Sequence, residues 1–68
     1  MTDAKLNKVK AEMTKITPYK TQDGWDRCGE SSKYWLDYDQ STADSRLVNK
    51  KTGKTEWSYY ADFYNGYN

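Results

Sequence analysis

The sequence predicts an α+β fold in which a single N-terminal helix packs on a three- to four-stranded antiparallel β-meander. Three observations predict this fold. Aliphatic residues recur with helical spacing near the N-terminus, two later segments are rich in strand-forming aromatic residues, and a polar turn containing glycine precedes the second of these segments. A chain of 68 residues has room for one hydrophobic core, so residues 1–68 are expected to form a single small domain.

The first predicted element is a helix over residues 3–16. Four apolar residues are separated by three, four and three positions, which places them on one side of a helix that should pack on the sheet. They are Leu6, Val9, Met13 and Ile16. Thr2 or Asp3 is expected to cap the N-terminus. Thr17 and Pro18 are expected to end the helix, because proline disfavours the helical conformation of the residue before it.

The sheet is predicted to occupy about residues 25–60. Residues 33–39 and 56–60 are rich in Tyr and Trp, which favour strands, and a shorter strand is expected at residues 25–28. The predicted turns are residues 29–32 and the polar segment 39–44.

Side chains of the strand at residues 33–39 alternate between the two faces of the sheet. The face that carries Tyr34, Leu36 and Tyr38 is expected to contact the helix. Trp35 is therefore expected on the opposite face.

A hairpin turn is predicted at residues 49–55. Gly53 suits the left-handed position that closes a type I turn with a β-bulge. This turn would place Leu47 opposite Trp57, whereas a two-residue turn would place Val48 there, and the bulged turn is favoured. The residues paired beside the bulged turn would be Lys50 and Lys54.

Aromatic rings supply most of the apolar side-chain mass. Leu, Ile, Val and Phe together number seven, whereas the chain holds three Trp and seven Tyr. Because a buried ring removes about 150–250 Å² from water, a few rings replace many aliphatic residues. The sequence predicts an aromatic core and a polar surface, followed by a Tyr-rich tail at residues 61–68 whose order it does not decide.

Charge is balanced overall but varies along the chain. The net charge of +1 combines +3 in residues 1–20, −4 in residues 21–45 and +2 in residues 46–68. A duplex-DNA-binding protein usually carries a continuous basic face, so this distribution disfavours that function.

Catalysis and metal binding have little support. The chain has no His, and its only Cys, Cys28, is expected to be a packing residue. Residues 37–41 match the start of a calcium-binding loop, but Thr42 and Val48 occupy the positions that need Gly and Glu. We therefore expect no enzymatic activity, no cofactor and no metal ion.

The sequence predicts a cytoplasmic protein without a membrane partner. No segment approaches the roughly 20 apolar residues of a membrane-spanning helix, and Met1 precedes polar residues instead of a signal peptide. A single cysteine also fits a reducing compartment.

A third of the chain resembles the second and third strands of a WW domain, a family that binds Pro-rich peptides. The resemblance rests on Trp35, on Trp57 and on the Asn and Thr of that family at Asn49 and Thr55. Arg46 and Leu47 stand where the family has its tyrosine pair. Lys50 stands in place of its histidine, and Tyr60 in place of its closing proline. Of the ligand-binding set only Trp57 is present, so this segment is interpreted as a strand–turn–strand unit outside the family.

Protein binding is the expected function. The chain has more Trp, Tyr and Arg than its small core requires, and these residue types carry much of the binding energy of protein interfaces. We expect an inhibitor or adaptor that covers a surface of a larger protein, by analogy with small proteins that viruses direct against host machinery. The residues expected to bind are Trp35, Arg46, Lys50, Lys54, Tyr60 and Tyr64.

Single-stranded nucleic acid is the alternative partner. Aromatic side chains on a sheet face can stack on bases while nearby Lys and Arg contact phosphates. Acidic side chains at positions 37, 39 and 44 would oppose this binding. The sequence does not decide whether the chain also self-associates through the same rings.

Overall fold

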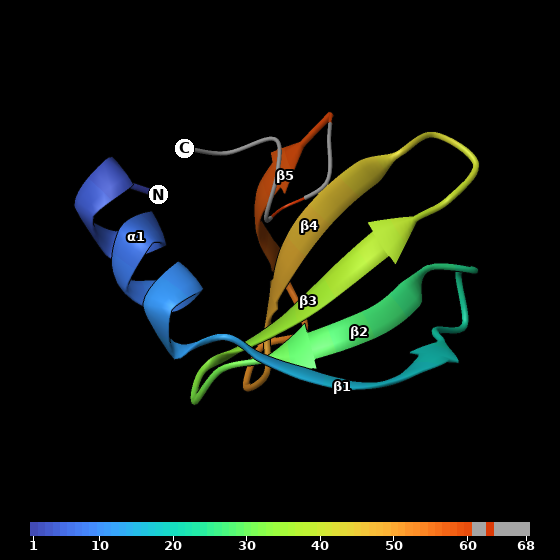
Figure 1. Cartoon of the computed structure of the whole chain (residues 1–68), viewed down its shortest axis with the longest axis horizontal. Helices are drawn as coiled ribbons and strands as arrows, with labels where there is room; N and C mark the ends of the chain where they lie inside the picture. The colour runs from blue at the N-terminus through green and yellow to red at the C-terminus, as the bar shows by residue number, and fades with distance from the viewer. Residues whose placement is uncertain (61–62, 64–68) are drawn as a thin grey trace.

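The computed structural model describes residues 1–60 and Phe63. The elements are α1 (Asp3–Glu12), β1 (Thr14–Lys20), β2 (Asp26–Glu30), β3 (Tyr34–Asp39), β4 (Asp44–Asn49) and β5 (Thr55–Tyr59). The strands form one antiparallel sheet of five strands in the order β1-β2-β3-β4-β5 (Figure 1). The α+β meander is confirmed, but the predicted number of strands is too low. The tail predicted at residues 61–68 lies outside the described residues except for Phe63.

The helix is shorter than the sequence predicts. Thr2 caps its start, and the Thr2 Oγ1 accepts a hydrogen bond from the backbone N–H of Lys5 at 3.2 Å. The helix ends at Glu12 instead of residue 16, and Met13 already has an extended backbone. Ile16 therefore lies in β1, where its spacing from Met13 no longer reflects a helical repeat.

The additional strand is β1, which pairs with β2 at one edge of the sheet. Pro18 lies within β1 and does not end the preceding element as predicted. An edge strand tolerates proline because one side of its backbone needs no ladder hydrogen bond. The pairing register shifts between Lys15 and Tyr19, on either side of this proline. Pairing with β2 thus overrides the helical pattern of the sequence.

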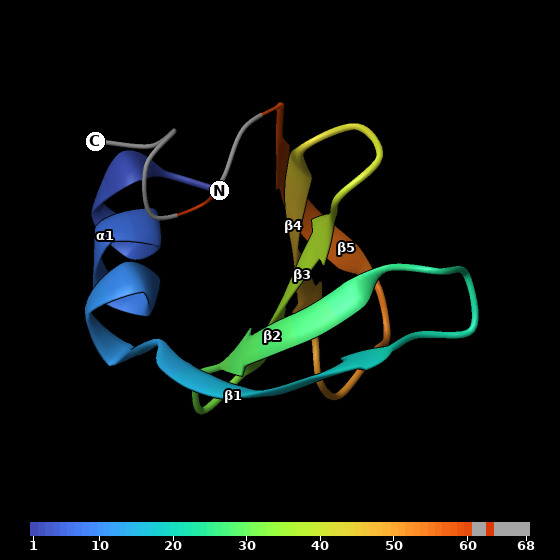
Figure 2. The ribbon, with the colours of Figure 1, turned by 45° about the vertical axis from the view of Figure 1, so that its right-hand side comes forward.

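The core lies between α1 and the face of the sheet that we call the helix face (Figure 2). Its buried residues are Leu6, Val9, Tyr34, Leu36, Leu47 and Phe63, and Met13, Cys28 and Trp57 pack against them. The predicted alternation of β3 is confirmed, because Tyr34 and Leu36 are buried in this core while Trp35 lies on the opposite face.

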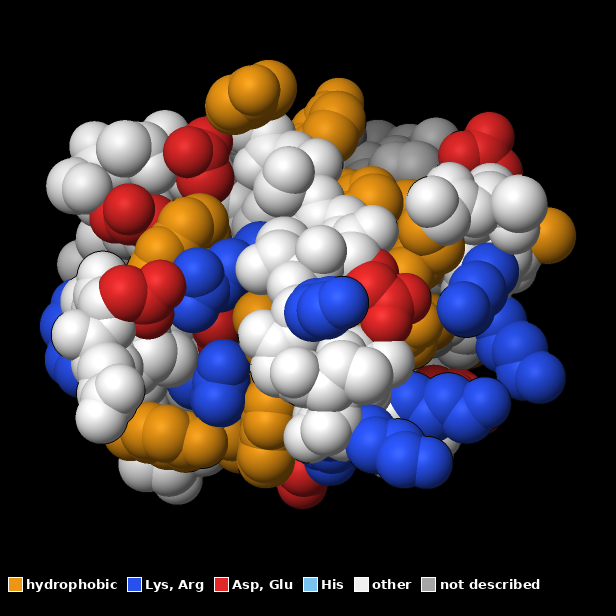
Figure 3. All heavy atoms as spheres, turned by 180° about the vertical axis from the view of Figure 1, so that it is seen from behind, with side chains coloured by type: hydrophobic (Ala, Val, Ile, Leu, Met, Phe, Trp, Pro, Cys, Tyr) orange, Lys and Arg blue, Asp and Glu red, His pale blue; other side chains and the backbone are white. Residues whose placement is uncertain are grey.

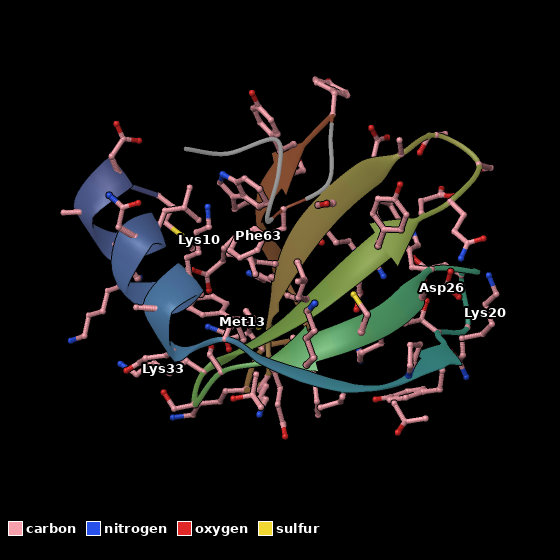
Figure 4. All side chains as sticks on the ribbon, in the orientation of Figure 1. Lys10, Met13, Lys20, Asp26, Lys33 and Phe63 are labelled. Atoms are coloured by element: carbon pink, nitrogen blue, oxygen red, sulfur yellow. The ribbon has the colours of Figure 1, made fainter. Side chains whose placement is uncertain are left out.

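Phe63 completes this core from beyond the last strand. It is 1% exposed and lies between α1 and the sheet (Figure 4). Its ring meets the Trp57 ring edge to face, with centroids 5.3 Å apart. Trp57 is half-buried and packs against the core cluster.

The register of β4 and β5 is the one predicted. Gly53 has the expected left-handed backbone, with φ of +75°, and Leu47 pairs with Trp57. The next pair is Val48 with Thr55, so the register shifts by one residue between these two pairs. The alternative pairing of Val48 with Trp57 is wrong.

The bulge that produces this register lies in β5 at Glu56, away from the turn. In place of the predicted pair of Lys50 and Lys54, the N–H of Asn49 donates to the carbonyl of Lys54 at 2.9 Å. The Glu56 carboxylate accepts hydrogen bonds from the Tyr34 hydroxyl at 2.8 Å and from the Asn49 amide at 2.6 Å. These contacts hold the bulged residue against the helix face.

Candidate functional site

The candidate site is the outer face, which we define as the side of the sheet opposite α1. Its central residues are Arg27 of β2, Trp35 and Asp37 of β3, and Arg46 and Val48 of β4, which are paired across the strands. Seen from behind the sheet, basic, acidic and hydrophobic side chains lie next to one another (Figure 3). Trp35 and Arg46 of the predicted binding set are thus brought together.

Asp37 is the centre of this face, and its side chain has no exposed surface. Arg27 donates to it twice, from Nε to Oδ1 at 2.8 Å and from Nη2 to Oδ2 at 3.0 Å. Arg46 Nε donates to Oδ2 at 2.8 Å. A carboxylate can be buried when several charge-assisted hydrogen bonds replace its water shell. The same hydrogen bonding raises the pKa of Arg27.

A second aspartate fixes the outer end of Arg46. Asp23, in the β1–β2 turn, accepts hydrogen bonds from Arg46 Nη1 at 2.8 Å and Nη2 at 3.1 Å. The hydroxyl of Thr21 also donates to Asp23, at 2.6 Å. The hydrogen bonds from Arg46, which have the larger effect, and from Thr21 hold the pKa of the Asp23 carboxyl well below its usual range. Arg46 therefore links the turn to the middle of the sheet.

Cations cover both tryptophan rings of the outer face. The guanidinium carbon of Arg46 lies 4.3 Å from the centroid of the Trp25 ring. Lys50 Nζ lies 4.3 Å from the Trp35 centroid, and the Arg27 guanidinium lies 5.2 Å from it. Such cation–π contacts fix the orientation of the rings and of the cations together.

The charges of this network balance. Lys50 Nζ pairs with Glu30 Oε2 at 2.8 Å. The three cations are Arg27, Arg46 and Lys50, and the three carboxylates are Asp23, Glu30 and Asp37. The outer face therefore offers aromatic and guanidinium surface without a net positive charge.

A shallow groove of about 620 Å³ crosses this face between the β1–β2 hairpin and the β4–β5 turn. Its walls include Tyr19, Asp23, Arg27, Arg46, Val48 and Thr55. Tyr19, at the side of the groove, is 49% exposed. Lys54 lies beside the groove, because its neighbours Gly53 and Thr55 both line it.

The other predicted site residues are placed differently. Tyr60 follows the edge strand β5 and is 91% exposed. Tyr64 lies outside the described residues. The sequence reasoning missed Trp25, Arg27 and the two aspartates. Asp37 alternates onto the same face of β3 as Trp35, but only the pairing of β2 with β3 shows that Arg27 meets it.

The helix face also carries a cleft beside the core. This cleft of about 480 Å³ is lined by Ile16, Pro18, Cys28, Leu36, Tyr38 and Phe63, together with several polar side chains. Cys28 is half-buried against the core, with its Sγ 3.7 Å from the Leu36 carbonyl oxygen. Within residues 1–60 and Phe63, no cluster of carboxylate and thiol side chains is arranged to hold a metal ion.

Comparisons with known proteins identify no matching family model, no similar curated protein and no similar solved structure. No helix in the described part of the chain has the length and apolar character needed to cross a membrane. Fold and surface together define a small α+β domain with a charge-balanced aromatic outer face.

Proposed function

We propose that this chain is a non-enzymatic protein-binding module whose outer face covers a surface of a larger protein partner, as inhibitors and adaptors do. The observation that carries the proposal is the fixed arrangement around Asp37. One buried carboxylate holds Arg27 and Arg46, and these two side chains hold Trp35 and Trp25.

Two physical arguments support a protein partner. Trp, Tyr and Arg are the residues most often found at binding hot spots. Side chains that are already fixed lose little conformational entropy on binding, so more of their contact energy remains as affinity. Arg46 also keeps N–H groups beyond the three that bind Asp23 and Asp37, and these can donate to a partner's carbonyl oxygens.

The charge balance disfavours the alternative of single-stranded nucleic acid at this face. Binding of a phosphate backbone relies on uncompensated cations, and base stacking requires an open ring face. Arg46 and Lys50, the cations of the predicted binding set that lie on this face, are both paired with carboxylates. Lys50 additionally covers the Trp35 ring.

Affinity capture from cell lysate, with and without nuclease, tests the proposal. Wild type should capture a defined protein, and this capture should persist after nuclease treatment. Trp35→Ala should bind that protein at least roughly thirtyfold more weakly, a loss of about 2 kcal/mol of binding free energy. Asn7→Ala is the control, because Asn7 is exposed on α1 and lines neither the outer-face groove nor the hollow beside the helix.

Circular dichroism of both variants establishes that they remain folded. Capture of nucleic acid alone would contradict the proposal. Unchanged capture by a folded Trp35→Ala variant would also contradict it.

A further inference from the structure

Five lysines form no ion pair within the described residues. They are Lys5, Lys8, Lys33, Lys51 and Lys54. They come from α1, the β2–β3 turn and the β4–β5 turn. In a meander these two turns lie at the same end of the sheet, as Figure 1 shows. The N–H of Lys50 joins them by donating to the Lys33 carbonyl at 2.9 Å.

Three of these lysines surround a small hollow of about 160 Å³ between α1 and the β2–β3 turn, which we call the lysine hollow. Its lining residues are Lys5, Lys8, Val9, Glu12, Ser31, Ser32, Lys33 and Tyr34. Lys33 lies beside the C-terminal end of α1 (Figure 4). The cations therefore approach the hollow from two separate elements of the fold.

The β2–β3 turn adds neutral hydrogen-bond donors to these charges. The Ser31 hydroxyl oxygen accepts from the N–H of Tyr34 at 3.1 Å, which leaves its own proton available to donate. The backbone N–H groups of Ser32 and Lys33 donate to no acceptor within residues 1–60 and Phe63. Consecutive free N–H groups in a turn favour anions.

We propose that the lysine hollow binds a single phosphate monoester group. Its size suits one tetrahedral anion, and its lysines, hydroxyls and free N–H groups match the three acceptor oxygens of such a group. A monoester carries nearly two negative charges near neutral pH, whereas each phosphodiester carries one. The carboxylate of Glu12 also lines the hollow, so the charged side chains of its lining sum to +2. Lys5 Nζ lies over the Tyr34 ring, 5.8 Å from its centroid, which leaves Lys8 and Lys33 as the main partners of the dianion. This inference does not depend on the proposed function of the outer face.

Titration with O-phosphoserine, followed by amide NMR shifts at constant ionic strength, tests the proposal. The amides of residues 31–33 should shift with saturation. Lys8→Gln and Lys33→Gln should each weaken binding about two- to fivefold, as expected for exposed charge pairs. Lys54→Gln is the matched control, since Lys54 is an exposed lysine that does not line the hollow.

Two further probes distinguish sources of the phosphate. If inorganic phosphate also binds with saturation, the natural ligand of the hollow is a free anion. If only O-phosphoserine binds, the natural ligand is a phosphorylated side chain. Both outcomes support the site. An oligothymidylate without a terminal phosphate should produce no saturable shift at residues 31–33. Non-saturating shifts with O-phosphoserine, or equal losses in Lys33→Gln and Lys54→Gln, would overturn the proposal.

Discussion

Asp37 and Arg27 form a two-point ion pair between β3 and β2, with nitrogen–oxygen distances of 2.8 and 3.0 Å. The aspartate is completely buried, while the arginine side chain keeps 18% of its surface exposed. One member of the pair is thus a fixed anchor, and the other keeps side-chain surface accessible to solvent. This asymmetry explains how the outer face can be rigid and still expose charged side chains.

Asp37→Asn should lower the free energy of unfolding by about 3 kcal/mol. The amide removes the negative charge that compensates Arg27 and Arg46, and breaking a buried ion pair typically costs about 3–5 kcal/mol. Urea denaturation measures this loss. Asp39→Asn is the control and should cost less than about 1.5 kcal/mol, because the Asp39 carboxylate accepts its hydrogen bonds within its own turn, from Ser41 and Thr42. Similar losses in both variants would argue against a central role for Asp37.

Trp57→Ala should unfold the domain or destabilise it by about 3 kcal/mol. The indole packs against the core cluster and meets Phe63 edge to face, and truncating such a residue leaves a cavity. Thermal unfolding followed by circular dichroism gives the comparison with Trp35→Ala, which should stay folded. A stable Trp57→Ala variant would show that this ring is dispensable for the core.

Met13→Asp should also unfold the chain, whereas Lys8→Asp should change its melting temperature little. Met13 packs against the core at the end of α1, and an unpaired charge there would cost several kcal/mol. Lys8 is exposed on the helix. Equal melting temperatures for Met13→Asp and wild type would disprove the docking of α1 on the sheet at this point.

Asp23 should make stability depend on pH in the acidic range. Its folded-state pKa is lowered by Arg46 and Thr21, so its contribution is complete above the unfolded value of about 4 and is lost as the pH falls through the folded value. As the pH falls from 6 to 2, the free energy of unfolding measured with urea should therefore decrease less for Asp23→Asn than for wild type. Parallel curves for the two proteins would indicate that Asp23 and Arg46 do not interact in solution.

The elements predicted correctly from the sequence depend on neighbouring residues. Thr2 caps the helix because a hydroxyl reaches the N–H three residues later. Gly53 adopts its left-handed backbone because the turn requires a conformation that other residues resist. Tyr34 and Trp35 lie on opposite faces because strand geometry alternates side chains. Each of these features is fixed over a few residues and is therefore visible in the sequence.

The predictions that failed depend on contacts between distant segments. The spacing of Met13 and Ile16 fits a helix, yet residues 14–20 form β1 because pairing with β2 satisfies their backbone groups. Arg46 belongs to the predicted binding set, and its pairing with Asp23, 23 residues away in the chain, is not visible in any local pattern of the sequence.

The sequence by itself determined the aromatic composition, the near-neutral charge, the helix start and the strand–turn–strand unit around Gly53. The tertiary structure decided which cations form ion pairs with carboxylates and which line the lysine hollow. It also placed Phe63 in the core. The physical reason is that periodicity is a local property, whereas ion pairs and burial are set by the register and packing of strands that are far apart in the chain.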